Sequence, residues 1–264
     1  MRRRLHRVKP VLVIHAFVLA TGCGMHQGDL TPTRATVSAA EAPLVAEGRA
    51  LFNDVKLSGD GQWSCASCHP NNGHTNNKTY VGVTVVPDGD PKGRSTPTMW
   101  GVGTRQAISW AGTAPSLQAN IRGIIVNRMK GPEPSPAMLA ALVAYVKSLG
   151  YPANPNLNAD GKPSAAAPAA ARRGHDVFVR AGCQACHLPP TYDKKDVEDV
   201  FSGGKFKVPS LRVVAHTAPY FHDGRFATLE QTVKYMWEYV QKAGTTEKLT
   251  DGDLRDLVEF LKIL

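Results

Sequence analysis

The stretch CASCH at residues 65–69 recurs as CQACH at residues 183–187. Each copy has two cysteines three positions apart and a histidine directly after the second. The two copies contain four of the five cysteines in the chain, and only Cys23 lies outside them. Two occurrences at the same spacing suggest a duplicated binding site, and a duplication predicts that the flanking sequence is repeated too.

The sequence around the two motifs does repeat. Corresponding positions are Gly48 and Gly174, Phe52 and Phe178, residues 97–99 and 209–211, and residues 139–149 and 254–264. The offset between the copies changes only slightly along the chain, as expected for a tandem duplication with loops of different length. We therefore predict an N-terminal domain at 41–150 and a C-terminal domain at 171–264. Residues 151–170 are rich in Pro and Ala without periodicity, and we expect them to form a linker.

The last segment of each copy predicts an amphipathic helix. In LAALVAYVKSL (139–149) the apolar residues recur at i, i+3, i+4 and i+7, and LRDLVEFLKIL (254–264) has the same stripe. Ser135 before Pro136 is a typical helix start, and Thr250 with Asp253 has the spacing of a capping box. No stretch alternates convincingly between polar and apolar residues, so both domains are expected to be mostly helical.

The N-terminus predicts export. A basic segment (residues 1–10) precedes a run of about ten apolar residues, which is typical of a signal peptide and too short to span a bilayer. Residues 20–22 ahead of Cys23 resemble a lipoprotein cleavage site. We expect residues 1–22 to be the signal peptide, Cys23 to carry a lipid and residues 23–40 to be a tether, which predicts a periplasmic, membrane-anchored protein. Cleavage by a general signal peptidase, which would leave Cys23 as a stray thiol, is the alternative.

The charge of the exported part is small. It has 26 basic and 22 acidic residues once the signal peptide is set aside. It has no basic run interleaved with aromatic residues, so the sequence gives no support to nucleic-acid binding.

In an exported protein, C-x-x-C-H is the attachment signature of a c-type haem. Thiols at i and i+3 lie on one side of a helical turn, from which both can form thioethers, and the next imidazole can bind the iron. The alternatives are structural zinc, which needs four ligands, and a redox dithiol, which needs no histidine. The sequence therefore predicts two haem c groups, one on Cys65, Cys68 and the proximal ligand His69, the other on Cys183, Cys186 and the proximal ligand His187.

The segment KVPSLRVVAHTAPYFHDGRFATLEQTVKYM (207–236) resembles the second domain of the bacterial di-haem cytochrome c peroxidase family. The segments GRSTPTMWGV (93–102) and SWAGTAPSL (109–117) resemble its first domain, and the resemblance runs from about residue 45 to the end. It implies two tandem cytochrome c-like helical domains that face each other, an electron-transferring haem in the C-terminal domain and a peroxidatic haem in the N-terminal domain.

The resemblance also implies roles for residues between the haems. Trp110 matches the family's tryptophan on the electron path, although simple packing would also explain an indole there. Family members often bind calcium between the domains; Thr217 and Pro219 match that site, but Ser95 replaces an Asn. Calcium is therefore a candidate third ligand, besides the two haems.

The residue on the far side of each haem from the proximal histidine is the distal ligand. Where a distal ligand is bound, the iron is closed to peroxide, and where none is bound, peroxide can bind. Met236 stands where the family has the distal methionine of the C-terminal haem, and a core methionine is the alternative interpretation. For the N-terminal haem we expect Met129, with His74 as the alternative. We interpret Met99 and Met138 as core residues. Arg94 and Arg212, one in each copy, are candidates for neutralising haem propionates, or else exposed charges.

The catalytic residues depart from those of the peroxidases. The family's WDGR is WAGT here (110–113), Asn120 stands in place of a glutamine, and Glu133 is the only acid near Met129. Cleavage of the O–O bond needs a group that moves a proton. We therefore expect an electron-carrying di-haem cytochrome whose partner is a small redox protein or a respiratory-chain component. The alternatives are an enzyme that reduces hydrogen peroxide at the N-terminal haem, and a module that relays electrons for a larger oxidoreductase.

Overall fold

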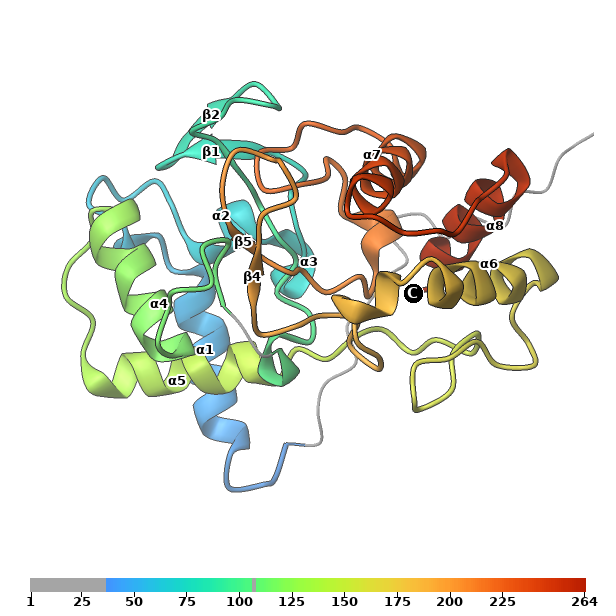
Figure 1. The fold of residues 1–264 in the computed structure, drawn as a ribbon. Helices are drawn as coiled ribbons and strands as arrows, with labels where there is room; N and C mark the ends of the chain where they lie inside the picture. Colours follow the sequence, from blue (N-terminus) through green and yellow to red (C-terminus); the bar gives the residue numbers. More distant parts are fainter. Residues whose placement is uncertain (1–36, 106–107) are drawn as a thin grey trace, which may run out of the picture. The chain divides into compact units, whose positions relative to one another are not determined.

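A computed structural model describes residues 37–105 and 108–264. The predicted signal peptide, Cys23 and the tether up to residue 36 lie outside the described residues. The described chain from residue 37 onward belongs to one compact unit (Figure 1).

The N-terminal half is built on the crossing of two helices. α1 (Ala42–Asn53) packs against α5 (Pro136–Lys147), and α4 (Leu117–Gly123) packs beside α5 (Figure 1). The rings of Phe52 and Tyr145 meet edge to face at 5.1 Å across the crossing. Gly48 faces the backbone of Ala141 so closely that a side chain would overlap it.

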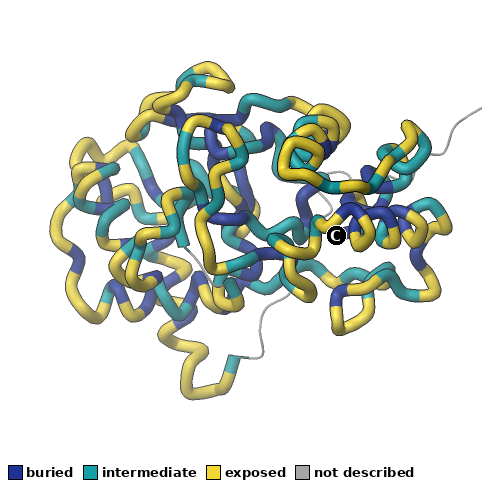
Figure 2. Tube along the Cα trace, in the orientation of Figure 1, coloured by how far each residue is buried: buried dark blue, intermediate teal, exposed yellow. Residues whose placement is uncertain are grey.

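The C-terminal half repeats this arrangement. α6 (Ala169–Arg180) packs against α8 (Asp251–Lys262), with α7 (Leu229–Lys242) on α8, and Gly174 faces the backbone of Asp256 as Gly48 faces Ala141. Phe178, Tyr192 and Phe260 form a buried aromatic cluster with centroid separations of 5.4–5.9 Å. Buried positions follow one side of each of these helices (Figure 2). The predicted mostly helical fold is confirmed.

The two predicted helix starts are confirmed. The side chain of Ser135 accepts a hydrogen bond from the amide of Met138, and α5 begins at Pro136. At α8, Thr250 and Asp253 form a reciprocal capping box. These bonds satisfy amides that have no partner inside the helix, and they fix where each helix enters the core.

The segment between His69 and Pro97 contains short strands, which sequence periodicity did not indicate. β1 (Thr79–Val81) pairs antiparallel with both β2 (Thr84–Val86) and β3 (Arg94–Ser95), and β4 (Val197–Glu198) pairs with β5 (Phe206–Lys207). Strands of two or three residues are too short to show an alternating pattern.

The remaining short elements are α2 (Cys65–Cys68), α3 (Pro70–Gly73), the 3-10 turns η2 (Val55–Leu57), η3 (Val102–Thr104), η5 (Cys183–Ala185) and η6 (Val214–His216), and the π-turn η4 (Ile124–Arg128).

Hydrogen bonds between loops join the two halves. The amide of Ser95 donates to the carbonyl of His222 at 2.7 Å, and the amide of Lys207 donates to the carbonyl of Trp110 at 2.9 Å. The hydroxyls of Tyr151 and Ser210 lie 2.9 Å apart. Residues 151–170, the predicted linker, also contact the C-terminal half, because Asn154 donates to the carbonyl of Ile263.

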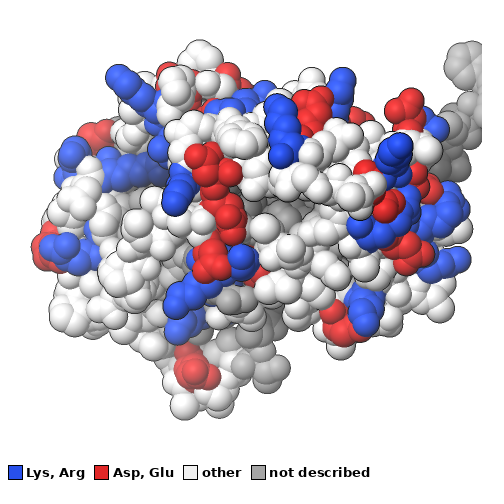
Figure 3. Space-filling model, viewed as in Figure 1, with Lys and Arg blue, Asp and Glu red and all other residues white. Residues whose placement is uncertain are grey.

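Within the described residues, no helix combines the length and the apolar character that crossing a bilayer requires. Basic and acidic side chains are intermixed on the face shown in Figure 3. This mixture agrees with the small net charge of the sequence outside the predicted signal peptide.

The two helix crossings give a prediction for stability. Gly48→Ala and Gly174→Ala should each lower the free energy of unfolding by about 1–3 kcal/mol, because the new methyl group must push two backbones apart. Gly123→Ala is the matched control: its methyl group would meet only the amide of Asn127 at 3.8 Å, so stability should be unchanged or slightly higher. Urea unfolding followed by circular dichroism measures all three. Equal effects at Gly48 and Gly123 would contradict this account of the crossing.

Candidate functional site

The first C-x-x-C-H motif forms one turn of helix. In α2 the hydroxyl of Ser64 and the side chain of Ser67 cap the N-terminus reciprocally, and the amide of His69 donates to the carbonyl of Cys65 at 2.9 Å. This turn brings Cys65, Cys68 and His69 to the wall of one cavity of about 430 Å³.

The thiols of this motif lie in surroundings that keep them neutral. Burial raises the pKa of Cys65 to about 12 and raises the pKa of Cys68. The four motif cysteines form no disulfide, and within the described residues no three His, Cys, Asp or Glu side chains gather to hold a metal ion.

The histidine of the motif is also neutral. Burial lowers the pKa of His69 to about 4, and a neutral imidazole is the form that binds a metal. Its Nδ1 is buried without a hydrogen-bond partner in the described part of the chain. Two neutral thiols, a neutral imidazole and a largely apolar cavity fit a haem held covalently by Cys65 and Cys68 with His69 on the iron.

The second motif has a similar local fold. Cys183 lies in η5, and the amide of His187 donates to the carbonyl of Cys183 at 3.0 Å. Burial raises the pKa of Cys183 to about 11 and lowers that of His187. Nδ1 of His187 lies 3.0 Å from the carbonyl of Tyr192, a contact that orients the ring and leaves Nε2 for a metal. These residues also fit a covalent haem.

Met129 lines the same cavity as His69 and is only 7% exposed. It follows the π-turn η4, where its amide donates to the carbonyl of Ile124 at 2.9 Å. Turns of this type often mark functional positions in helices. The structure thus brings together the predicted proximal and distal residues of the N-terminal haem.

The other candidates for this distal position lie in different surroundings. Met99 also lines the cavity, whereas Met138 does not. His74 is 1% exposed, its Nδ1 contacts the hydroxyl of Thr98, its Nε2 contacts the carbonyl of His216, and its ring stacks on Trp100 at 4.2 Å. Because both ring nitrogens have protein partners, His74 is a packing residue that joins the two halves.

Met236 lies half-buried in the middle of α7 and does not line this cavity. Tyr239, almost one turn later on the same side of the helix, has a pKa raised by burial and next by the thiol of Cys186. The contacts described for this part of the chain include none between Met236 and His187.

Trp110 lies at the wall of the cavity, held by equivalent positions of the repeat. Its indole donates to the carbonyl of Ser95 at 2.8 Å, and its own carbonyl accepts the amide of Lys207 at 2.9 Å. Ser95 and Lys207 are the residues two before the repeated Pro97 and Pro209. The indole thus lies where the two halves meet.

The acid–base equipment of the cavity is sparse. Ala111, Asn120 and Arg128 line it, but none of the described residues in its wall is Asp or Glu. Glu133, the acid nearest in sequence to Met129, is mostly exposed and forms a two-bond ion pair with Arg122. The described part of the wall therefore offers no carboxylate to move a proton.

The positions that match the family's calcium site come together. Ser95, Thr217 and Pro219 all line the cavity, and the hydroxyl of Ser95 donates to the carbonyl of Pro219 at 3.2 Å. The carbonyl that would face a cation thus already accepts a hydrogen bond in this arrangement.

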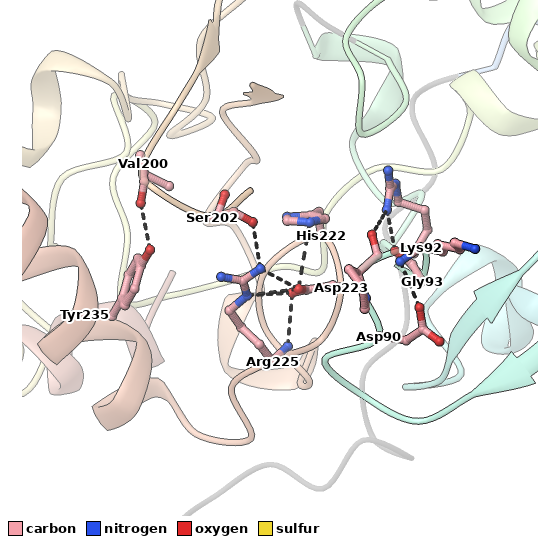
Figure 4. A network of polar contacts seen from close by, with 11 residues as sticks. Asp90, Lys92, Gly93, Val200, Ser202, His222, Asp223, Arg225 and Tyr235 are labelled. Atoms are coloured by element: carbon pink, nitrogen blue, oxygen red, sulfur yellow. Dashed lines mark hydrogen bonds and ion pairs between the residues drawn. The ribbon is translucent and has the colours of Figure 1, made fainter. Parts of the chain in front are cut away.

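Sequence reasoning did not identify the polar network beside Trp110. Asp223 is 1% exposed and is held by the guanidinium of Arg225, which also donates to the carbonyl of Ser202 (Figure 4). His222 lies above it, stacked on Phe206 at 3.5 Å. The spacing Asp-x-Arg at 223–225 is the sequence signal for this pair, but such spacing is common on surfaces.

Comparison with known proteins identifies similar chains. Residues 42–154 match the family described as di-haem cytochrome c peroxidase. The chain is 29% identical to methylamine utilization protein MauG of Methylorubrum extorquens, over 83% of this chain and 77% of that protein. It is 28% identical to cytochrome c551 peroxidase of Pseudomonas aeruginosa, over 82% and 77%. A solved hydrazine synthase chain of Kuenenia stuttgartiensis has a similar fold, with a TM-score of 0.66 at 22% identity over 97% of this chain and all of that one.

The Asp223–Arg225 pair gives a pH-dependent prediction. Burial disfavours the charged carboxylate, but the hydrogen bonds and charge of Arg225 outweigh it and lower the pKa of Asp223. The pair therefore stabilises the fold above the unfolded pKa of about 3.9, and this contribution is lost as the pH falls through the lower folded pKa. Arg225→Gln should cost about 3 kcal/mol at pH 7 and progressively less below about pH 4.

The control is Arg173→Gln, which removes an equally well-formed but exposed pair with Asp256. This change should cost much less than Arg225→Gln, because water screens the charge of the exposed Arg173. Urea unfolding between pH 3 and pH 7 measures both variants. An Arg225→Gln deficit that grows as the pH falls would contradict the prediction.

Proposed function

Because the chain belongs to the di-haem cytochrome c peroxidase family, we propose that it is an exported di-haem c-type cytochrome that carries electrons through two covalently attached haems. Bound haem supplies one-electron transfer at the iron. The residues of this chain attach each haem, ligate its iron and connect the two haems.

In this proposal the two motifs attach and ligate the haems. Cys65 and Cys68 form thioethers in the N-terminal half, and His69 is the proximal ligand. Cys183, Cys186 and His187 do the same in the C-terminal half. Neutral, buried thiols and imidazoles support these roles, because ligation and thioether formation need no charged side chain in the apolar cavity.

Distal methionines close both irons in the proposal. Met129, buried in the same cavity wall as His69, is the ligand of the N-terminal haem. Met236 on α7 is the ligand of the C-terminal haem. A thioether on the far side favours electron transfer over the binding of small molecules, and Trp110, held at the junction of the halves, lies on the path between the haems.

The observation that carries the proposal is the lack of a carboxylate in the described wall of the cavity. Peroxide reduction needs a side chain that takes a proton from one oxygen and gives it to the other. Arg128 is a permanent cation whose guanidinium donates to the carbonyl of Gly82, and Asn120 cannot exchange a proton at neutral pH. These residues suit a relay better than a peroxidase.

Hydrogen peroxide reduction is the second candidate. The family match covers residues 42–154, the half that contains most of this cavity, and several relatives are named peroxidases. In this candidate Met129 would have to leave room for peroxide at the N-terminal haem. A single fold that serves proteins named MauG, peroxidase and hydrazine synthase cannot decide between these roles.

The partner in the proposal is a small redox protein or a respiratory-chain component. We place the protein in the periplasm, held at a membrane if Cys23 carries a lipid.

Two methionines of the same cavity provide the test of the distal ligand. Met129→Leu should make cyanide bind to the oxidised protein on the order of tenfold faster or more, because no thioether bond must open first. Met99→Leu, the matched control in the same wall, should bind cyanide as slowly as the unaltered protein. Stopped-flow absorbance measures both.

A second measurement separates the two candidate functions. Rapid reaction of the unaltered, half-reduced protein with peroxide would overturn the relay and favour the peroxidase. Fast cyanide binding in Met99→Leu with no change in Met129→Leu would transfer the ligand role to Met99.

A further inference from the structure

The cavity beside the first motif is lined by cations. Among the described residues of its wall, five are permanently or ordinarily positive and none is acidic. The five are Arg94, Arg105, Arg128, Lys207 and Arg212. Burial lowers the pKa of Arg128, and the nearby charge of Arg94 adds a smaller effect in the same direction. A cavity with this lining favours an anionic ligand.

Most of these cations already have partners for their N–H groups. Arg94 donates to the carbonyl of Gly93, and Arg128 donates to that of Gly82. Arg212 donates to the main-chain oxygen of Leu264 and lies over the ring of Tyr151. Their side chains are therefore held in place by the fold itself.

Lys207 differs from them. It is 7% exposed, and neither a hydrogen bond nor an ion pair to its ammonium is found in the described part of the chain. Burial, and next the charge of Arg105, lower its pKa to about 7, and the opposing effect of Asp193 is smaller. The side chain of Lys207 is mostly buried, and an anion within ion-pair distance of its ammonium would offset the desolvation of its charge.

Arg105 also has a donor group without a hydrogen-bond partner among the described residues. Its two terminal nitrogens donate to the carbonyls of Thr98 and Trp100, but its Nε is buried without a partner in the described residues. Lys207 comes from the C-terminal half and Arg105 from the N-terminal half, and both line the cavity that contains His69. The two side chains thus present unsatisfied donors to one space.

We propose that Lys207 and Arg105 together bind a carboxylate of the haem in this cavity, so that a propionate is held between the two halves of the protein. The inference rests on the haem of the proposed function, but it holds for a relay and for a peroxidase alike. The propionate accepts hydrogen bonds from both donors, and its negative charge offsets the cost of burying two cations.

This contact has a consequence for the reduction equilibrium. A positive charge beside the haem stabilises the reduced state, which carries one more electron. Lys207→Met removes the charge while keeping an unbranched side chain, and should shift the reduction equilibrium of one haem about tenfold toward the oxidised state, a fall of about 59 mV for a one-electron couple. Lys207→Arg should keep most of the potential. Lys205→Met, two positions earlier and exposed, should leave both potentials unchanged.

Spectroelectrochemical titration of the purified protein with both haems attached measures these potentials. If the two one-electron waves of Lys207→Met coincide with those of the unaltered protein, the propionate contact is wrong. Haem content, measured as the pyridine haemochrome, distinguishes a failure of the proposed function from a failure of the role of Lys207. Fewer than two haems per chain in the unaltered protein would overturn the proposed function, whereas two haems with unchanged waves overturn only the role of Lys207.

Thermal unfolding gives an independent readout whose sign is diagnostic. If Lys207 is paired with a propionate, Lys207→Met leaves a buried carboxylate without its partner and lowers the melting temperature. If Lys207 has no partner, the same change removes an uncompensated buried charge and raises the melting temperature. A higher melting temperature in Lys207→Met would therefore contradict the inference even if the potentials were difficult to resolve.

Discussion

The structure depends on a space that its own side chains do not fill. The cavity of about 430 Å³ lies against the first C-x-x-C-H turn, the π-turn before Met129 and the loops of the C-terminal half. A space of this size between the two halves is large enough to take a substantial group, and its lining is mostly apolar with cations at its wall. The chain has only 7% aromatic residues, so a bound porphyrin is the group that can complete this core. The short helix α2, the neutral thiols and the cationic wall all fit a cavity that binds a haem.

The repeated parts of the fold could be predicted from the sequence because they obey local rules. The apolar stripes of 139–149 and 254–264 lie largely in α5 and α8, and Ser135 and Thr250 cap these helices as their side chains predict. Gly48 and Gly174 occur at matching places because two backbones cross there in each half. The strands β1–β5 escaped prediction, since two or three paired residues carry no period of their own.

The candidate site was predictable only in part. The spacing of the two motifs indicated Cys65, Cys68 and His69, and the structure places Met129 in the same cavity wall. Sequence alone could not separate Met129 from His74, because the distinction lies in long-range contacts: His74 is held by Thr98 and by the carbonyl of His216, a residue of the other half. Lys207 escaped notice for the same reason. A lysine is ordinarily exposed, and only the packing around strand β5 buries this one.

The most direct test of the account is the EPR spectrum of the half-reduced protein, recorded with and without calcium and then after peroxide is added. We expect the remaining ferric haem to stay low-spin under both conditions and to react slowly with peroxide. The proposal makes Met129 the ligand that closes this iron, and none of the described residues in the cavity wall is a carboxylate that could assist proton transfer. A high-spin signal that disappears rapidly with peroxide would contradict the electron-carrying role. It would instead assign the N-terminal cavity to peroxide reduction.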